Sequence, residues 1–156
     1  MKGDPAIIEA LNEVLTAELT AINQYYIHYK MCENWGYLKI AQHSRGEAME
    51  EMQHADKVIE RILFLDGIPN MQRLFPVKVG ETVKEQLELD LALELEAVKR
   101  LNTAVALCTQ KGDNGSRMLV ESILKDEEEA IDWGEAQLGI IREIGFHAWL
   151  AEQLTA

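Results

Sequence analysis

Apolar side chains recur every three to four residues along four long stretches of the chain, which is the spacing of amphipathic helices. The first stretch begins at Asp4-Pro5, because Asp can cap a helix and Pro fits its first turn, and it ends at Trp35-Gly36. Glycine, proline or short polar turns bound the other stretches. The predicted helices span residues 5–35, 38–66 and 82–112, then a fourth helix ending at 145 after a short turn at 113–115, and one short further helix at 146–154.

Residues 67–81 show no helical stripe and contain Pro69, Pro76 and Gly80. Two helices with a tight turn, one long connection and two more helices with a tight turn predict a four-helix bundle with a crossover. We therefore expect a single all-α domain over residues 1–156. The apolar side chains of the connection are expected to pack on the bundle: Ile68, Leu74, Phe75 and Val77.

The composition agrees with a helical protein, since 47% of the 156 residues are apolar and only three are proline. The formal net charge of −12 disfavours nucleic acid and anionic membranes as partners and favours cations. No apolar run reaches membrane-span length and no signal sequence is evident, so we expect a cytoplasmic protein. Cys32 and Cys108 lack CxxC spacing and are expected to be buried thiols rather than a disulfide.

Four acids belong to two pairs with the same spacing on the predicted helices: Glu18 with Glu51, and Glu94 with Glu127. Each pair spans 33 residues, and the second pair is the first displaced by 76 residues. His54 lies three residues after the second acid of the first pair, but Ala130 stands at the matching place in the second pair. The chain therefore contains two similar half-sites, of which one lacks a histidine.

These acids fall inside the apolar stripes, where a carboxylate is costly to bury unless its charge is compensated. No inward Lys or Arg occurs at this level, so a metal ion is the simplest source of positive charge. Glu51 and His54 share a helix face, and carboxylates with imidazole favour iron or manganese over structural zinc. The alternatives are acids that lie just off the core in ion pairs, or a metal-free bundle. His28, also on a core stripe, is expected to be a hydrogen-bonded core residue.

Five segments of the chain are typical of one family: Met1-Lys2-Gly3-Asp4, Ala21-Ile22-Asn23-Gln24-Tyr25, Glu51-Met52-Gln53-His54-Ala55-Asp56, Glu60-Arg61-Ile62-Leu63-Phe64-Leu65 and Glu127-Glu128-Glu129-Ala130-Ile131-Asp132-Trp133. On these segments the chain resembles the bacterioferritins, over essentially its whole length apart from the crossover and the last few residues. The resemblance implies a ferritin-like four-helix bundle with a long crossover between helices 2 and 3 and a short C-terminal fifth helix. It also implies heme-containing iron storage in shells of roughly 24 subunits.

The resemblance further implies a ferroxidase centre that binds two irons, with Glu18, Glu51, His54, Glu94 and Glu127 at the positions of its ligands. The sixth ligand of the family pattern is a histidine where this chain has Ala130, so we expect a weaker second iron site. A histidine and an aspartate that are proposed to hold an inner-surface iron in the family are replaced by Gly46 and Glu50. Tyr25 and Trp133, which lie beside the centre in the family, are retained.

Met52 is the candidate heme ligand. It lies on the side of its helix away from Glu51 and His54, where a methionine is ordinarily a packing residue. The resemblance implies that heme b is shared between two subunits, each of which supplies this methionine. The outer face of the first helix would line the heme pocket or form a plain dimer interface: Leu19, Ile22, Asn23, Tyr26 and Trp35.

The function implied by the resemblance is iron storage and detoxification, in which Fe(II) is oxidised by oxygen or peroxide and kept as Fe(III) in the shell cavity. An electron-donor protein would release the stored iron. The alternative is a heme-carrying structural subunit with impaired ferroxidase activity that co-assembles with a second, active bacterioferritin subunit. A substrate-oxidising di-iron enzyme is a third class, but the chain has no insertion that could build a hydrophobic substrate pocket.

Overall fold

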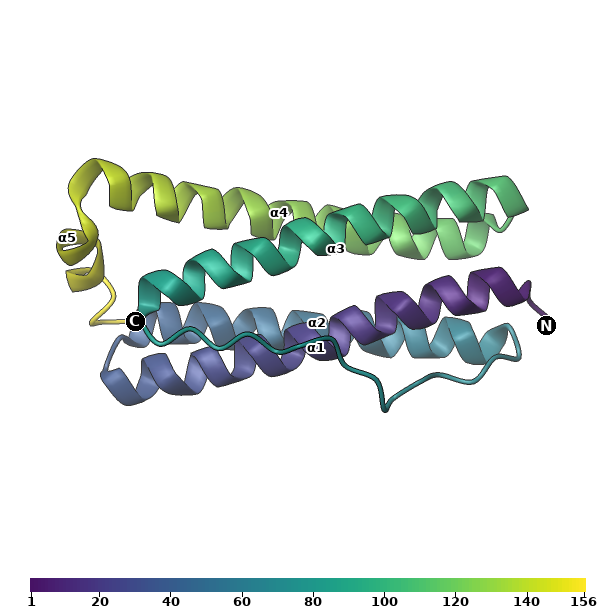
Figure 1. Cartoon of the computed structure of the whole chain (residues 1–156), viewed down its shortest axis with the longest axis horizontal. Helices are drawn as coiled ribbons and strands as arrows, with labels where there is room; N and C mark the ends of the chain where they lie inside the picture. The colour runs from purple at the N-terminus through teal and green to yellow at the C-terminus, as the bar shows by residue number, and fades with distance from the viewer.

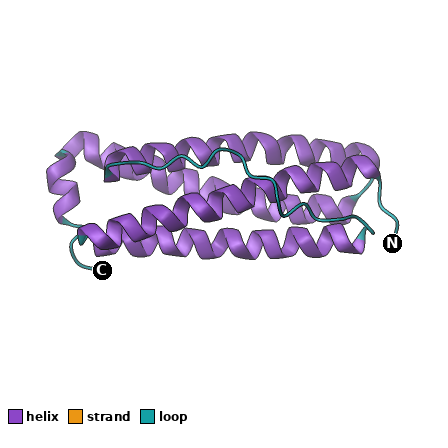
Figure 2. Ribbon diagram, turned by 60° about the horizontal axis from the view of Figure 1, so that its bottom comes forward, coloured by secondary structure: helices purple, strands orange, loops and turns teal.

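Four long helices and one short helix make up the computed structural model, which describes residues 1–156 (Figure 1). They are α1 (Pro5–Trp35), α2 (Leu38–Phe64), α3 (Val83–Lys111), α4 (Asn114–Ile144) and α5 (Phe146–Ala151). The α1–α2 and α3–α4 hairpins lie side by side, and the segments between helices are loops (Figures 1 and 2). The predicted all-α four-helix bundle, with its crossover between α2 and α3 and its short fifth helix, is confirmed.

Capping residues set the helix ends close to the predicted positions. The Asp4 carboxylate accepts a hydrogen bond from the backbone N–H of Ala6 at 2.8 Å, and the Thr82 hydroxyl accepts one from Glu85 at 3.2 Å. Gly36 has a φ of 89°, in the left-handed region that favours glycine, so α1 ends there.

The predicted turn at 113–115 is shorter than expected, because α4 already begins at Asn114. The Asp113 carboxylate caps this helix by accepting a hydrogen bond from the backbone N–H of Ser116 at 3.0 Å. Arg61 of α2 donates to the same carboxylate at 2.9 Å. Because Asp113 both caps α4 and forms an ion pair with Arg61, it links the start of α4 to α2.

Two larger apolar clusters fill the ends of the bundle, and the level between them combines the buried acids with a third cluster of only three residues, Ala21, Tyr25 and Ala48. The larger cluster holds 13 buried residues, among them Leu11, Ile62 and Ile123. The smaller holds seven, including Ile40 and Trp149, the latter carried by α5. The short fifth helix therefore closes one end of the core, and the buried acids of α1 to α4 fall between the two clusters along each helix.

The crossover between α2 and α3 runs along α1 (Figure 2). Side chains on successive turns of α1 accept its backbone N–H groups: Thr20 from Phe75 at 2.9 Å, Gln24 from Lys78 at 3.2 Å and His28 from Gly80 at 2.9 Å. Phe75 and Val77 are partly buried, but Ile68 and Leu74 are 85% and 47% exposed. The prediction that all four pack on the bundle is therefore wrong for two of them, since polar contacts to α1 hold the segment.

Three further predictions can be compared with the structure. His28 is fully buried, and its Nδ1 lies 2.9 Å from Asp90 Oδ1, so it is a hydrogen-bonded core residue as expected. Cys32 and Cys108 are both buried free thiols. None of the helices combines the length and the apolar character that crossing a bilayer requires.

Candidate metal centre

The four long helices bring acids to one level of the bundle interior. Glu18 of α1, Glu51 of α2, Glu94 of α3 and Glu127 of α4 are each 2–3% exposed, and His54 of α2 is 2% exposed. Each acid takes a place that the 3.6-residue period assigns to the core, so the helical pattern itself turns the carboxylates inward. All five residues predicted for the site are buried here.

Four of the five form a compact cluster. Ligand atoms of Glu18, Glu51, His54 and Glu127 all lie within 4.8 Å of one another. His54 Nδ1 is at the centre, 3.2 Å from Glu127 Oε1 and 3.5 Å from one oxygen each of Glu18 and Glu51. Three helices thus aim one imidazole nitrogen and three carboxylates at a common point.

Several ligand atoms of this cluster and of the neighbouring Glu94 have no hydrogen-bond partner although they are buried. They are Glu18 Oε2, His54 Nδ1, Glu94 Oε2 and Glu127 Oε1. An unsatisfied buried polar group ordinarily costs about 1–3 kcal/mol, and more when it is charged. No Lys or Arg forms an ion pair with these carboxylates, and the basic side chain in contact with Glu18, Glu51 and Glu127 is His54. Oxygen and nitrogen donors that converge without partners fit a metal ion, and the carboxylate-rich set fits iron or manganese.

His54 is oriented from the far side of its ring. Its Nε2 lies 2.8 Å from Asp126 Oδ2 and 3.9 Å from Glu50 Oε1. Because a carboxylate only accepts, Nε2 carries a hydrogen toward Asp126, and Nδ1 faces the acids, where a metal ion would take the place of its proton. Asp126 makes this contact although its side chain is 41% exposed.

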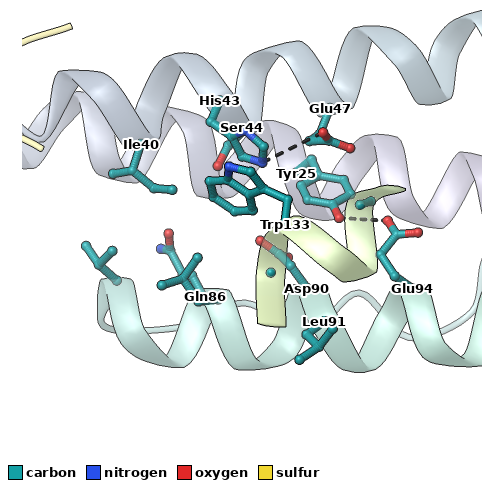
Figure 3. Close-up of a pocket in the computed structure, with 14 residues that line it drawn as sticks. Tyr25, Ile40, His43, Ser44, Glu47, Gln86, Asp90, Leu91, Glu94 and Trp133 are labelled. Atoms are coloured by element: carbon teal, nitrogen blue, oxygen red, sulfur yellow. Dashed lines mark hydrogen bonds and ion pairs between the residues drawn. The ribbon is translucent and has the colours of Figure 1, made fainter. Parts of the chain in front are cut away.

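Glu94 stands apart from the compact cluster. The Tyr25 hydroxyl donates a hydrogen bond to its Oε1 at 2.7 Å, while Oε2 remains unpaired (Figure 3). Tyr25 therefore does lie beside the acids, as the family pattern implies. Trp133 instead stacks on His43, with ring centroids 3.4 Å apart and planes 11° from parallel.

Burial and mutual charge shift the proton affinities of the cluster. Burial, reinforced by the charge of Glu127, raises the pKa of Glu18 to about 7. Burial opposes the charged form of His54, but close contacts with Glu127 and Glu18 raise its pKa to about 11. Without metal, the cluster holds protons at neutral pH where a cation could replace them.

Ala130 lies on α4 beside a small cavity of about 20 Å³, room for one water molecule. The cavity is also bordered by Glu94 and Glu47 (Figure 3). The second half-site therefore has its acids in the core but empty space where the symmetry of the chain calls for an imidazole.

The predicted heme face lies outside the bundle. Met52 is 52% exposed, Tyr26 47% and Trp35 37%, whereas Leu19 and Ile22 are partly buried against the core. The thioether of Met52 is therefore accessible from outside the bundle, on the side away from the buried acids.

Acids and a histidine from several helices of a crossover four-helix bundle match the general description of ferritin-like, carboxylate-rich bundles. The family described as a ferritin-like domain matches residues 8–144. The "Bacterioferritin" of Mycolicibacterium paratuberculosis is 48% identical over 97% of this chain and 96% of its own. Those of Streptomyces coelicolor and Brucella melitensis are 48% and 45% identical, over 97% and 93% of this chain and 90% of each relative. The chain belongs to the bacterioferritin family.

Proposed function

We propose that this protein stores iron, binding Fe(II) between its helices, oxidising it and keeping Fe(III) in the cavity of a self-assembled shell. The observation that carries the proposal is the set of buried ligand atoms without partners at the convergence of the helices. Membership of the bacterioferritin family supports the same role.

Within this proposal, Glu18, Glu51 and His54 hold one Fe(II), with Glu127 placed to bridge toward the second. The second Fe(II) is held by Glu51, Glu94 and Glu127. The two irons together give up two electrons, enough to reduce one peroxide to water with uptake of two protons, or oxygen to peroxide. The carboxylates supply the negative charge that favours Fe(III) over Fe(II), and this favours oxidation.

The chain's own residues set the geometry of this site. Asp126 fixes the tautomer of His54, and Tyr25 orients Glu94 through its hydroxyl. The four acids are 2–3% exposed and border a cavity of about 550 Å³ that residues of α1, α3 and the crossover also line. The exposed thioether of Met52 would hold heme b between two subunits, where the heme could carry electrons from a donor protein during iron release.

A second function is favoured by Ala130 together with Met52. A subunit whose second iron site lacks an imidazole, but whose heme ligand is kept, would serve as a heme-carrying structural partner of a more active subunit. Native mass spectrometry of shells from the source cells distinguishes the two. Shells that contain only this chain contradict the partner-subunit function.

The first test is the absorbance rise when Fe(II) is added aerobically to apo-shells of this chain and of the Ala130→His variant. Similar rates in both support a working ferroxidase. Rapid oxidation by the variant alone supports the heme-carrying structural role. Glu18→Ala combined with Glu51→Ala is the matched loss-of-site control, and unchanged oxidation in that variant overturns the assignment of the centre.

A further inference from the structure

The cavity beside Ala130 is bordered by carboxylates and contains no cationic side chain. Its lining includes Glu47 of α2 and Glu94 of α3, and neither Lys nor Arg contributes to it (Figure 3). The cavity is about 20 Å³ in volume, which suits one water molecule or one small ion.

Glu94, which borders this cavity and also the larger one shared with Glu18, Glu51 and Glu127, has an unused ligand atom. Its Oε2 is buried without a hydrogen-bond partner, while its Oε1 is fixed by the Tyr25 hydroxyl at 2.7 Å. The residue is 2% exposed, so water does not satisfy it from the surface. One oxygen is therefore held in place and the other left available to a cation.

Glu47 is the second available acid. It lies one helical turn before Glu51 on α2, so both side chains project from the same face of the helix. Its side chain is 16% exposed, and its one ion-pair contact is with His43, whose Nε2 lies 3.7 Å from Glu47 Oε1. That separation is too long for a hydrogen bond.

The third acid at the cavity is already engaged. Asp90 Oδ1 accepts a hydrogen bond from Gln24 Nε2 at 2.9 Å and lies 2.9 Å from His28 Nδ1. His43 is likewise committed, because its ring stacks on Trp133. Only Glu47 combines an unpaired carboxylate with a flexible side chain long enough to turn into the cavity.

We propose that Glu47 completes the second metal site by entering the cavity beside Ala130, with Glu94 as the fixed ligand opposite. This rests on the proposed function, since it assigns one more ligand to that same centre. A side-chain rotation breaks only the long contact with His43. The second site then contains oxygen donors alone, whereas the first keeps the nitrogen of His54, so the two sites differ in metal preference.

The test uses Mn(II), a hard redox-inactive probe, titrated anaerobically into apo-shells and followed by the loss of the free-ion EPR signal. Glu47→Gln keeps the shape of the side chain and removes its charge. We expect the weaker class of Mn(II) sites to lose at least about tenfold in affinity while the tighter class is unchanged. Glu88→Gln, an exposed acid on α3 whose side chain is 53% exposed, is the control and leaves both classes unchanged.

A second set of Mn(II) titrations uses the variant Ala130→His. In this background an imidazole fills the cavity, so adding Glu47→Gln is expected to have little further effect on the weaker sites. If the double variant binds as weakly as Glu47→Gln alone, the carboxylate acts through folding and the proposal is overturned. A crystal of the Mn(II)-loaded protein with the anomalous peak in contact with Glu47 supports it.

Failure of the role of Glu47 and failure of the proposed metal centre give different results in this titration. No Mn(II) bound by the parent shells overturns the proposed centre itself. Two classes of sites that do not respond to Glu47→Gln leave the centre standing, assign the cavity to water and overturn only the role of Glu47.

Discussion

His54 and Asp126 face each other across the α2–α4 interface, with Nε2 and Oδ2 2.8 Å apart. The contact directs the opposite ring nitrogen, Nδ1, at the three carboxylates of the compact cluster. A half-exposed acid thereby sets the orientation of a buried ligand, which is a common arrangement around metal-binding histidines.

The first prediction concerns this contact. Asp126→Asn should lower the affinity of the tighter Mn(II) sites by about 10–100-fold. An amide oxygen is a weaker acceptor for the Nε2–H of His54 than a carboxylate, so the tautomer is fixed less firmly and Nδ1 becomes less basic. Anaerobic Mn(II) titration measures the affinity. Asp132→Asn, an exposed acid on the same helix, is the control, and equal losses in both variants would mean that general charge is responsible.

The second prediction concerns pH. The folded-state pKa of Glu18, about 7, lies above the usual 4.5, and that of His54, about 11, lies above 6.5. Both groups bind protons more tightly in the folded apoprotein. Their contribution to stability is therefore full at low pH and is lost as pH rises, through 4.5–7 for Glu18 and through 6.5–11 for His54.

Thermal unfolding of metal-free protein across these windows measures that loss. Glu18→Gln cannot titrate, so the Tm of this variant should fall less than that of the parent between pH 4.5 and 7. Mn(II) displaces the same protons, so the apparent Tm of the loaded protein should instead rise with pH. A parent and variant with identical pH profiles would contradict the assignment.

The third prediction concerns the crossover. A Cβ added at Gly80 would lie 2.6 Å from the backbone nitrogen of Gln86, so Gly80→Ala must move backbone and should destabilise the subunit by about 1–3 kcal/mol. At Gly46, inside α2, the same addition meets nothing within 4 Å. Gly46→Ala should be neutral or stabilising by up to about 1 kcal/mol, because alanine favours the helix. Chemical denaturation compares them, and equal effects would contradict the crowding at Gly80.

The fourth prediction concerns heme. Met52→Leu preserves the size of this 52%-exposed side chain but removes the thioether, so purified shells should lose most of their Soret absorbance. Size-exclusion chromatography should still show assembled shells, since the apolar face remains. Met118→Leu, a 66%-exposed methionine on α4, is the matched control. Heme retained by the Met52 variant would reassign its ligand.

Much of the centre follows from periodicity. The 3.6-residue repeat places Glu18, Glu94 and Glu127 in core stripes, and the spacing of Glu51 and His54 puts both on one face. Sequence therefore predicts which acids are buried and on which helices. It also exposes the gap at Ala130, because the two half-sites repeat.

Contacts between helices do not follow from the helical period. Whether Asp126 reaches His54, or whether Trp133 stacks on His43 rather than on the acids, depends on the rotation and offset of one helix against another. The same holds for the crossover, whose backbone hydrogen bonds to Thr20, Gln24 and His28 leave Ile68 exposed where apolar character predicted burial.

The sequence by itself thus determined the class of fold, the four inward acids and the missing imidazole, since each depends on spacing along a single helix or on comparison of two helices. Only the tertiary structure decided which polar atoms remain without partners and that a cavity joins Ala130 to Glu47 and Glu94. The physical reason is that hydrogen-bond satisfaction and empty volume are properties of several helices packed together, and no local pattern encodes them.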